Sequence, residues 1–156
     1  MSNNPDVSRL ALITRGDLHQ SGVVTRVSAP AGAVLASFAA STDAPEATKY
    51  TVQSGETAHI NLAPDILRFI NHSCAPNVYF DVDARQVVSL VPVCEGDELT
   101  FFYPSTEWSM ASPFACACGA PTCAGTINGA RHMPAAALAG QRLAPHIQRL
   151  LAAHRG

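Results

Sequence analysis

The sequence is short of charge and of long apolar runs, and both shortages restrict what the protein can be. Charged residues make up 14% of the 156 residues, with ten Lys and Arg against twelve Asp and Glu. Such a balance offers no basic face to a phosphate backbone, so we expect no direct nucleic acid partner. No apolar stretch approaches the roughly 20 residues that cross a bilayer. The N-terminus also lacks the basic and apolar regions of a signal peptide, and we therefore expect a cytoplasmic protein without a membrane partner.

Apolar residues are plentiful, at 47% of the chain, and their pattern predicts a mostly β fold with minor α. A chain of this length and composition suits one compact domain. Short β-branched runs bounded by Gly and Pro predict strands. We expect them at 11–16, 22–29, 32–38, 50–55, 57–63, 77–82, 85–93 and 96–103. The polar stretch at 39–49 contains Pro45 and is predicted to be a loop.

Helix is predicted mainly near the C-terminus. A single turn is expected at 64–70, where Pro64 suits a first helical position. Regular helices are expected at 134–143 and 144–156. In the second of these, the spacing of Ile147, Leu150 and Leu151 fits a helix that lays one face on its own domain. Contact with a second copy is the alternative use of this face, so the protein is expected to be a monomer or a homodimer.

The cysteines are distributed unevenly. Of the five, Cys116, Cys118 and Cys123 fall within eight residues, whereas Cys74 and Cys94 stand alone. A disulfide framework is not expected in a reducing compartment. Three thiolates this close together can bind a soft cation such as zinc, but a closed structural zinc site needs a fourth ligand.

The fourth ligand must come from elsewhere in the chain. Cys74 is the best candidate, because Pro76 and Asn77 place it in a tight turn. His132 is a weaker alternative. Cys94 lies in the strand-like stretch VPVC and is predicted to be a small buried hydrophobe.

Three motifs stand in a recognisable order along the chain. They are RFINHSCAPN at 68–77, GDELTFFY at 96–103 and CACGAPTCAGTI at 116–127. In order and spacing they resemble the core and post-SET motifs of SET-domain lysine methyltransferases, over roughly residues 22–127. The resemblance implies several small curved β-sheets around a knot-like crossing of the NHSC and ELT..Y segments. It also implies a SET domain at 1–127 with a post-SET zinc segment at 113–127, followed by a C-terminal helical extension at 128–156 that packs on the same domain.

The resemblance further implies the chemistry and its residues. The cofactors would be S-adenosylmethionine and zinc, and the substrate a lysine amine, most simply one in a protein or peptide. Tyr103 matches the tyrosine at the methyl-transfer centre and Phe101 the aromatic residue that lines the lysine channel. The implied cofactor-binding residues are Gly22, Arg68, Phe69, Asn71, His72, Tyr103 and Phe114. The implied zinc ligands are Cys74, Cys116, Cys118 and Cys123.

Methyl transfer requires a neutral amine, and the stretch FFY suits that requirement. A lysine in water has a pKa near 10.4, and an apolar channel beside a sulfonium disfavours its charged form. Phe101 and Phe102 alternate across a strand, so only one of them can face the channel. If Phe101 lines the channel, it lacks the hydroxyl that would hold a water beside the amine, and the resemblance then implies room for a second or third methyl group. Without the flanking motifs, Tyr103 would be interpreted as a core aromatic.

Several departures from the family pattern keep other functions open. The first glycine of the family's GxG turn falls at Gln20, and Phe102 stands where an acidic residue is common. The Y-x-GE stretch after the third strand has no match, and the segment between Phe38 and Asn71 is short. One alternative is therefore a methyltransferase of a free amino acid or small amine. Another is a catalytically weak SET-fold binding module, whereas a zinc-binding DNA module fits poorly with the negative net charge.

Overall fold

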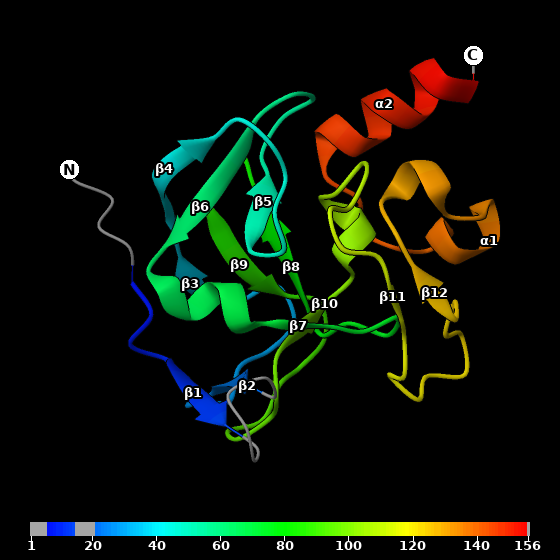
Figure 1. Ribbon diagram of the computed structural model, residues 1–156. Coiled ribbons are helices and arrows are strands. Elements are labelled where there is room, and N and C mark those ends of the chain that lie inside the picture. Colours follow the sequence, from blue (N-terminus) through cyan, green and yellow to red (C-terminus); the bar gives the residue numbers. More distant parts are fainter. Residues whose placement is uncertain (1–5, 15–20, 156) are drawn as a thin grey trace.

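The strands pair into small, separate sheets. Residues 6–14 and 21–155 are described by the computed structural model, and within them each sheet has two or three strands (Figure 1). Gln20 lies outside these residues. β1 (Leu10–Thr14) pairs antiparallel with β2 (Ser21–Thr25). A second sheet has the order β3-β9-β8, formed by Val34–Ser37, Gln86–Ser89 and Val78–Asp81.

The third sheet corrects one sequence prediction. Its order is β4-β6-β5, formed by Ala39–Ala44, His59–Ala63 and Thr51–Gln53. The stretch predicted to be a loop at 39–49 thus begins with a strand. Its central side chains are exposed and polar, so it lacks the apolar alternation by which strands are predicted. Its pairing with β6, which includes a register shift between Ala40 and Thr42, makes it a strand.

The NHSC segment and the segment that ends at Tyr103 lie side by side at the centre of the molecule (Figure 1). β7 (Asn71–His72) pairs parallel with β10 (Thr100–Phe101). Beyond the pair, the Ser73 N–H donates to the Phe101 carbonyl at 3.1 Å. The 3-10 helix η2 (Asp65–Phe69) leads into β7, with Pro64 at its N-cap rather than at its first helical position. The helix η3 (Tyr103–Ser105) follows β10, and the strand predicted at 96–103 is limited to Thr100–Phe101.

The C-terminal part adds one more strand pair and most of the helix. β11 (Phe114–Ala115) pairs antiparallel with β12 (Thr126–Ile127), and η4 (Ala130–His132) follows. α1 (Ala135–Leu138) is shorter than predicted, because Ala139 is extended and Gly140 has a φ of 78°. α2 (Pro145–Arg155) places Ile147 fully inside, at 0% exposure. No described helix is long and apolar enough to cross a membrane.

One hydrophobic core joins the sheets to the C-terminal segments. Val23, Val78 and Leu99 are each 0% exposed, and so is Ile127 of β12. Gly129 allows a close approach between two backbone segments, because a Cβ there would clash with the backbone of Trp108. The approach is fixed by hydrogen bonds from Ala130 N to the Glu107 carbonyl at 2.8 Å and from Arg131 N to the Trp108 carbonyl at 3.1 Å.

Candidate functional site

The crossing of the two central segments opens onto one cavity. Its volume is about 690 Å³, and it is bordered by both β7 and β10. Nine of the residues singled out from the sequence border it together: Arg68, Phe69, Asn71, His72, Phe101, Tyr103, Phe114, Cys116 and Cys118. Gly22 is set back from the wall, although its neighbour Ser21 borders the cavity. Residues that are distant in sequence therefore lie around one cavity.

Tyr103 lies where β10 bends into η3. Its hydroxyl donates a hydrogen bond to the Ile70 carbonyl at 2.9 Å. Its ring centroid lies 4.6 Å from that of Phe101 and 6.0 Å from that of Phe114. Burial raises the pKa of Tyr103 well above its ordinary value, so the phenol stays protonated at neutral pH. A lone pair of the phenol oxygen remains to accept a hydrogen bond from a ligand.

The two phenylalanines before Tyr103 face opposite ways, as the strand alternation predicts. Phe101 borders the cavity and stacks on Phe80 with ring centroids 4.4 Å apart. Phe102 is 2% exposed and does not border the cavity. It packs instead beside the His72 ring, at 5.6 Å between centroids. Phe101 is thus the aromatic side chain that this strand offers to a ligand.

The side-chain NH2 group of Asn71 is engaged in hydrogen bonds within the protein. Its Nδ2 donates to the Ser21 carbonyl at 2.9 Å and to Glu98 Oε2 at 3.1 Å. A Cβ at Gly22 would lie 3.1 Å from Glu98 Oε2 and 3.4 Å from Asn71 Nδ2, so a larger residue would crowd this arrangement. An asparagine side chain can in principle offer a ligand both a donor and an acceptor. The structure leaves its amide oxygen for that purpose.

A cationic and aromatic stack forms another part of the wall. The Arg68 guanidinium carbon lies 4.9 Å from the Tyr50 ring centroid and 4.8 Å from that of Phe69. Tyr50 and Phe69 meet edge to face at 6.5 Å. Flat apolar and cationic surfaces of this kind can stack on a planar ring or screen an anionic group. Tyr50 was not singled out from the sequence, since no motif includes it.

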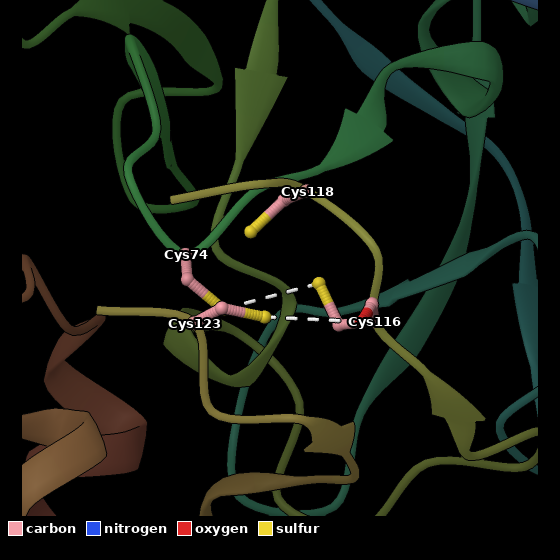
Figure 2. Close-up of side chains that lie close together, drawn as sticks. All are labelled: Cys74, Cys116, Cys118 and Cys123. Carbon is pink, nitrogen blue, oxygen red and sulfur yellow. Dashed lines mark hydrogen bonds between the residues drawn. The ribbon is translucent and has the colours of Figure 1, made fainter. Parts of the chain in front are cut away.

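The four predicted zinc ligands converge from two parts of the chain. Cys74 comes from the turn after β7, and the other three come from the loop between β11 and β12 (Figure 2). All four sulfur atoms lie within 4.8 Å of one another, and those of Cys74 and Cys116 are 4.0 Å apart. Zinc bound tetrahedrally at ~2.3 Å from each thiolate sets its sulfur atoms about 3.8 Å apart. The geometry and the donor set therefore fit zinc.

The other two candidates from the sequence lie outside this group. His132 hydrogen-bonds with Ser109 Oγ at 3.3 Å instead. Cys94 is exposed, which corrects the prediction that it is buried. Its backbone N–H donates to Asp97 Oδ2 at 2.8 Å within a turn, and Val93 takes the buried position at 2% exposure.

His72 connects the cavity to the cysteines. Its Nδ1 accepts a hydrogen bond from the Tyr103 backbone N–H at 3.1 Å, and its Nε2 lies 3.4 Å from Cys74 Sγ. Burial lowers the pKa of His72 to about 4, so the ring is neutral at physiological pH. Since Nδ1 is an acceptor, the single ring proton is on Nε2 and is donated to the sulfur. The imidazole therefore fixes the position of Tyr103 relative to Cys74.

One buried acid borders the cavity outside every motif. Glu107 is 8% exposed and lies one helical turn after Tyr103. In the sequence it stands beside Thr106 and Trp108 in a stretch without periodicity or charge pattern. Its burial depends on contacts with β5, far away in the chain, so no local signal identified it.

Comparison with known proteins places the chain in a family. The SET domain family matches residues 11–104, which is more than half of the chain. The chain therefore belongs to the SET-domain family, as its motifs suggested. The several small sheets and the central crossing are the predicted fold.

Individual relatives are methyltransferases by name. The methyltransferase flvH of Aspergillus flavus is 44% identical over 128 residues, which are 81% of this chain and 71% of that protein. The H3 lysine-4-specific histone-lysine N-methyltransferase of Schizosaccharomyces pombe is 41% identical over 70 residues. The H3 lysine-36-specific enzyme of Candida glabrata is 32% identical over 99 residues. The chain covers only 7% and 14% of these two histone enzymes.

Solved structures support the same fold. KRYPTONITE in complex with mCHG DNA and SAH superposes with a TM-score of 0.57 at 24% identity, over 75% of this chain and 28% of that chain. Its complex with mCHH DNA, an H3(1-15) peptide and SAH gives a TM-score of 0.55 at 22% identity. Similarity at this level of identity concerns the fold alone.

Proposed function

We propose that the protein is an S-adenosylmethionine-dependent N-methyltransferase that acts on a lysine amine of a protein substrate. The observation that carries the proposal is the single cavity bordered by both the NHSC segment and the aromatic pair Phe101 and Tyr103. A methyl donor and an amine must meet in one water-poor space for an in-line displacement. Methyltransferase relatives, and a fold neighbour solved with SAH and an H3 peptide, support this assignment.

The residues take distinct roles in the proposal. The methyl donor would be held by the residues that the family resemblance implies: Gly22, Arg68, Phe69, Asn71, His72, Tyr103 and Phe114. When bound, the donor supplies an electrophilic methyl group. Tyr103 would orient the amine through its phenol oxygen, and Phe101 would keep the amine in apolar surroundings that favour its neutral form.

Zinc would stabilise one wall of this cavity. Cys116 and Cys118 belong to both the cysteine cluster and the cavity border. A zinc ion bound by Cys74, Cys116, Cys118 and Cys123 would fix the loop between β11 and β12 onto the NHSC turn. We also propose that residues 128–156 form an extension of the same domain, since Ala144 N donates to the Ser105 carbonyl at 2.8 Å.

The test measures donor binding and methyl transfer separately. Calorimetry with S-adenosylmethionine should give one site per chain. Labelled donor should then transfer its methyl group to lysine-containing proteins and peptides, with free amino acids and small amines in the same panel. Transfer only to small amines would replace the protein substrate by the small-amine alternative. Binding without any transfer would favour a binding module, and the absence of binding would refute the proposal.

The chain offers a useful control for this experiment. Lys49 is its single lysine, and it borders the cavity. A Lys49→Arg variant therefore removes every lysine from the enzyme, so that any labelled methyl-lysine must belong to the added substrate.

A further inference from the structure

Glu107 is an acid in an unusual position. Among the described residues it is the only Asp or Glu that borders the cavity. It shares the wall with apolar side chains such as Val52, Leu67 and Phe101. A carboxylate in such surroundings is costly unless it has partners. Its position therefore needs a reason, and the motifs do not supply one.

The protein holds this carboxyl group by one of its two oxygens. Oε2 accepts hydrogen bonds from Gln53 N at 2.9 Å and from Thr106 Oγ1 at 2.8 Å. The Glu107 N–H donates to the Tyr103 carbonyl at 3.2 Å, which ties the acid to the proposed transfer centre. In the described part of the chain, Oε1 accepts no hydrogen bond. One oxygen of a firmly held carboxylate thus remains for a donor that enters the cavity.

The proposed reaction creates a need for such a group. A lysine amine arrives mostly as an ammonium ion and must lose a proton before its lone pair can attack. The phenol of Tyr103 donates to the Ile70 carbonyl and stays protonated, so it cannot take that proton. Both ring nitrogens of His72 are engaged, by Tyr103 N and by Cys74 Sγ. The remaining titratable groups at the border are the cations Lys49 and Arg68, the phenol of Tyr50, and the thiols Cys116 and Cys118.

We propose that Glu107 is a catalytic residue whose carboxylate binds the substrate ammonium through Oε1 and accepts its proton before methyl transfer. This inference rests on the proposed function. One N–H bond breaks and one O–H bond forms, so the ion pair becomes a neutral amine and a neutral carboxylic acid. The amine lone pair then forms the new N–C bond as the S–C bond of a methylsulfonium donor breaks. The products are a methylammonium ion and a thioether, and the acid returns its proton to water after the product leaves.

The electrostatics of the site suit this role. Burial raises the pKa of Glu107 to about 7, against the lowering effect of the hydrogen bonds from Gln53 and Thr106. A general base is most effective when its pKa lies near the working pH. An ordinary, exposed glutamate is too weak a base to take a proton from an amine. The apolar wall reduces the difference between the pKa of the acid and that of the amine. It favours the neutral form of both groups, which raises the pKa of the acid and lowers that of the amine.

The first test uses Glu107→Gln, because an amide oxygen can keep both hydrogen bonds that Oε2 accepts. Glu95→Gln is the matched control, since Glu95 is exposed and outside the cavity border. At pH 7 the kcat/KM of Glu107→Gln for a lysine peptide should fall at least about 100-fold, with S-adenosylhomocysteine binding unchanged. The deficit should shrink by roughly tenfold per pH unit toward pH 10, as water itself supplies neutral amine. An unchanged rate, or a deficit that is constant with pH, would overturn the proposal.

The second test needs no methyl donor and no turnover. N-acetyl-lysine methylamide should bind the wild-type protein at pH 7 with release of a fraction of a proton, measured by calorimetry in buffers of different ionisation enthalpy. N-acetyl-norleucine methylamide, the uncharged analogue, should release none. Ammonium binding without proton release would overturn the role of Glu107, even if the Glu107→Gln protein fails to fold. A wild-type protein that passes this test yet methylates nothing would refute the proposed function while leaving the ammonium site in place.

Discussion

The backbone N–H of Tyr103 donates to His72 Nδ1 at 3.1 Å, and this bond fixes the chemistry of the whole imidazole. It places the ring proton on Nε2, which faces Cys74 Sγ at 3.4 Å. Hydrogen bonds from outer residues commonly orient and tune metal ligands. A proposed metal ligand and the proposed transfer residue are thus two hydrogen bonds apart. Loss of metal should disturb Tyr103 through this connection as well as through the cavity wall.

Replacing Tyr103 by Phe should separate binding from turnover. The variant keeps the ring packing against Phe101 but loses the hydroxyl that donates to the Ile70 carbonyl. We expect kcat to fall by about 100-fold or more, because the amine loses its orienting oxygen. Donor affinity measured by calorimetry should change less than about threefold. Normal turnover in this variant would remove Tyr103 from the transfer centre.

The protein as purified should contain about one zinc ion per chain, by elemental analysis. Cys118→Ser should lower the zinc content and reduce the Tm by roughly 10 °C or more, since metal binding contributes directly to folding. Cys94→Ser is the control, because Cys94 is exposed and outside the cluster. A metal-free protein with full stability would refute the four-thiolate site.

Replacing Phe101 by Tyr should limit the number of methyl groups added. Phe101 stacks on Phe80 and contacts Tyr103, so a hydroxyl at this position would hold a water near the amine. We expect the wild-type enzyme to form di- or trimethyl-lysine and Phe101→Tyr to stop at an earlier stage. Mass spectrometry of the product measures the difference. Monomethylation alone by both proteins would contradict the assignment of Phe101 to the channel.

Two glycine substitutions should differ sharply in their effect on stability. A Cβ at Gly129 clashes with the Trp108 backbone, whereas one at Gly55 meets only the Ala58 Cβ at 3.5 Å. We expect Gly129→Ala to lower the free energy of unfolding by about 3 kcal/mol or more, since two backbones must separate. Gly55→Ala should change it by less than about 1 kcal/mol. Denaturant titration of the two variants provides the comparison.

Glu107 should make the protein less stable as the pH rises. Its pKa in the folded state is about 7, above the ordinary value of 4.5. Between these values the folded state binds more protons than the unfolded state, so stability decreases from pH 4.5 to above pH 7. Glu107→Gln should remove this decrease, worth about 3 kcal/mol at pH 8 relative to pH 4.5. Parallel pH profiles for the two proteins, measured by denaturant titration, would contradict the raised pKa.

The motifs predicted the features that depend on residues close together in the sequence. The spacing of Cys116, Cys118 and Cys123 indicated a metal site, and the resemblance correctly placed Cys74 beside them. The alternation of Phe101 and Phe102 across a short strand predicted that only one of them faces the cavity, and the resemblance indicated Phe101, which borders it. In each case the local spacing of residues determines the geometry. Closely spaced thiolates can bind one metal ion, and alternate residues of a strand face opposite sides.

Features that depend on distant contacts were missed for a physical reason. β4 (Ala39–Ala44) is polar and exposed, and it is a strand only because β6 supplies its partners. Cys94 looked buried because its neighbours are apolar, but a turn directs it to solvent. The environment of Glu107 is set by the Gln53 N–H, 54 residues away. None of these contacts can be predicted from the composition of the local sequence.

Cys116 and Cys118 belong both to the cysteine cluster and to the cavity border, and this has a chemical consequence. The thiols proposed to bind metal also line the space where the methyl donor would sit, and their sulfur atoms are close enough for oxidants to couple them. A single disulfide formed here would remove two zinc ligands and reshape the donor pocket in the same event. The proposed methyltransferase activity would then depend on the redox state of the protein's surroundings, and a thiol reductant together with zinc would restore it.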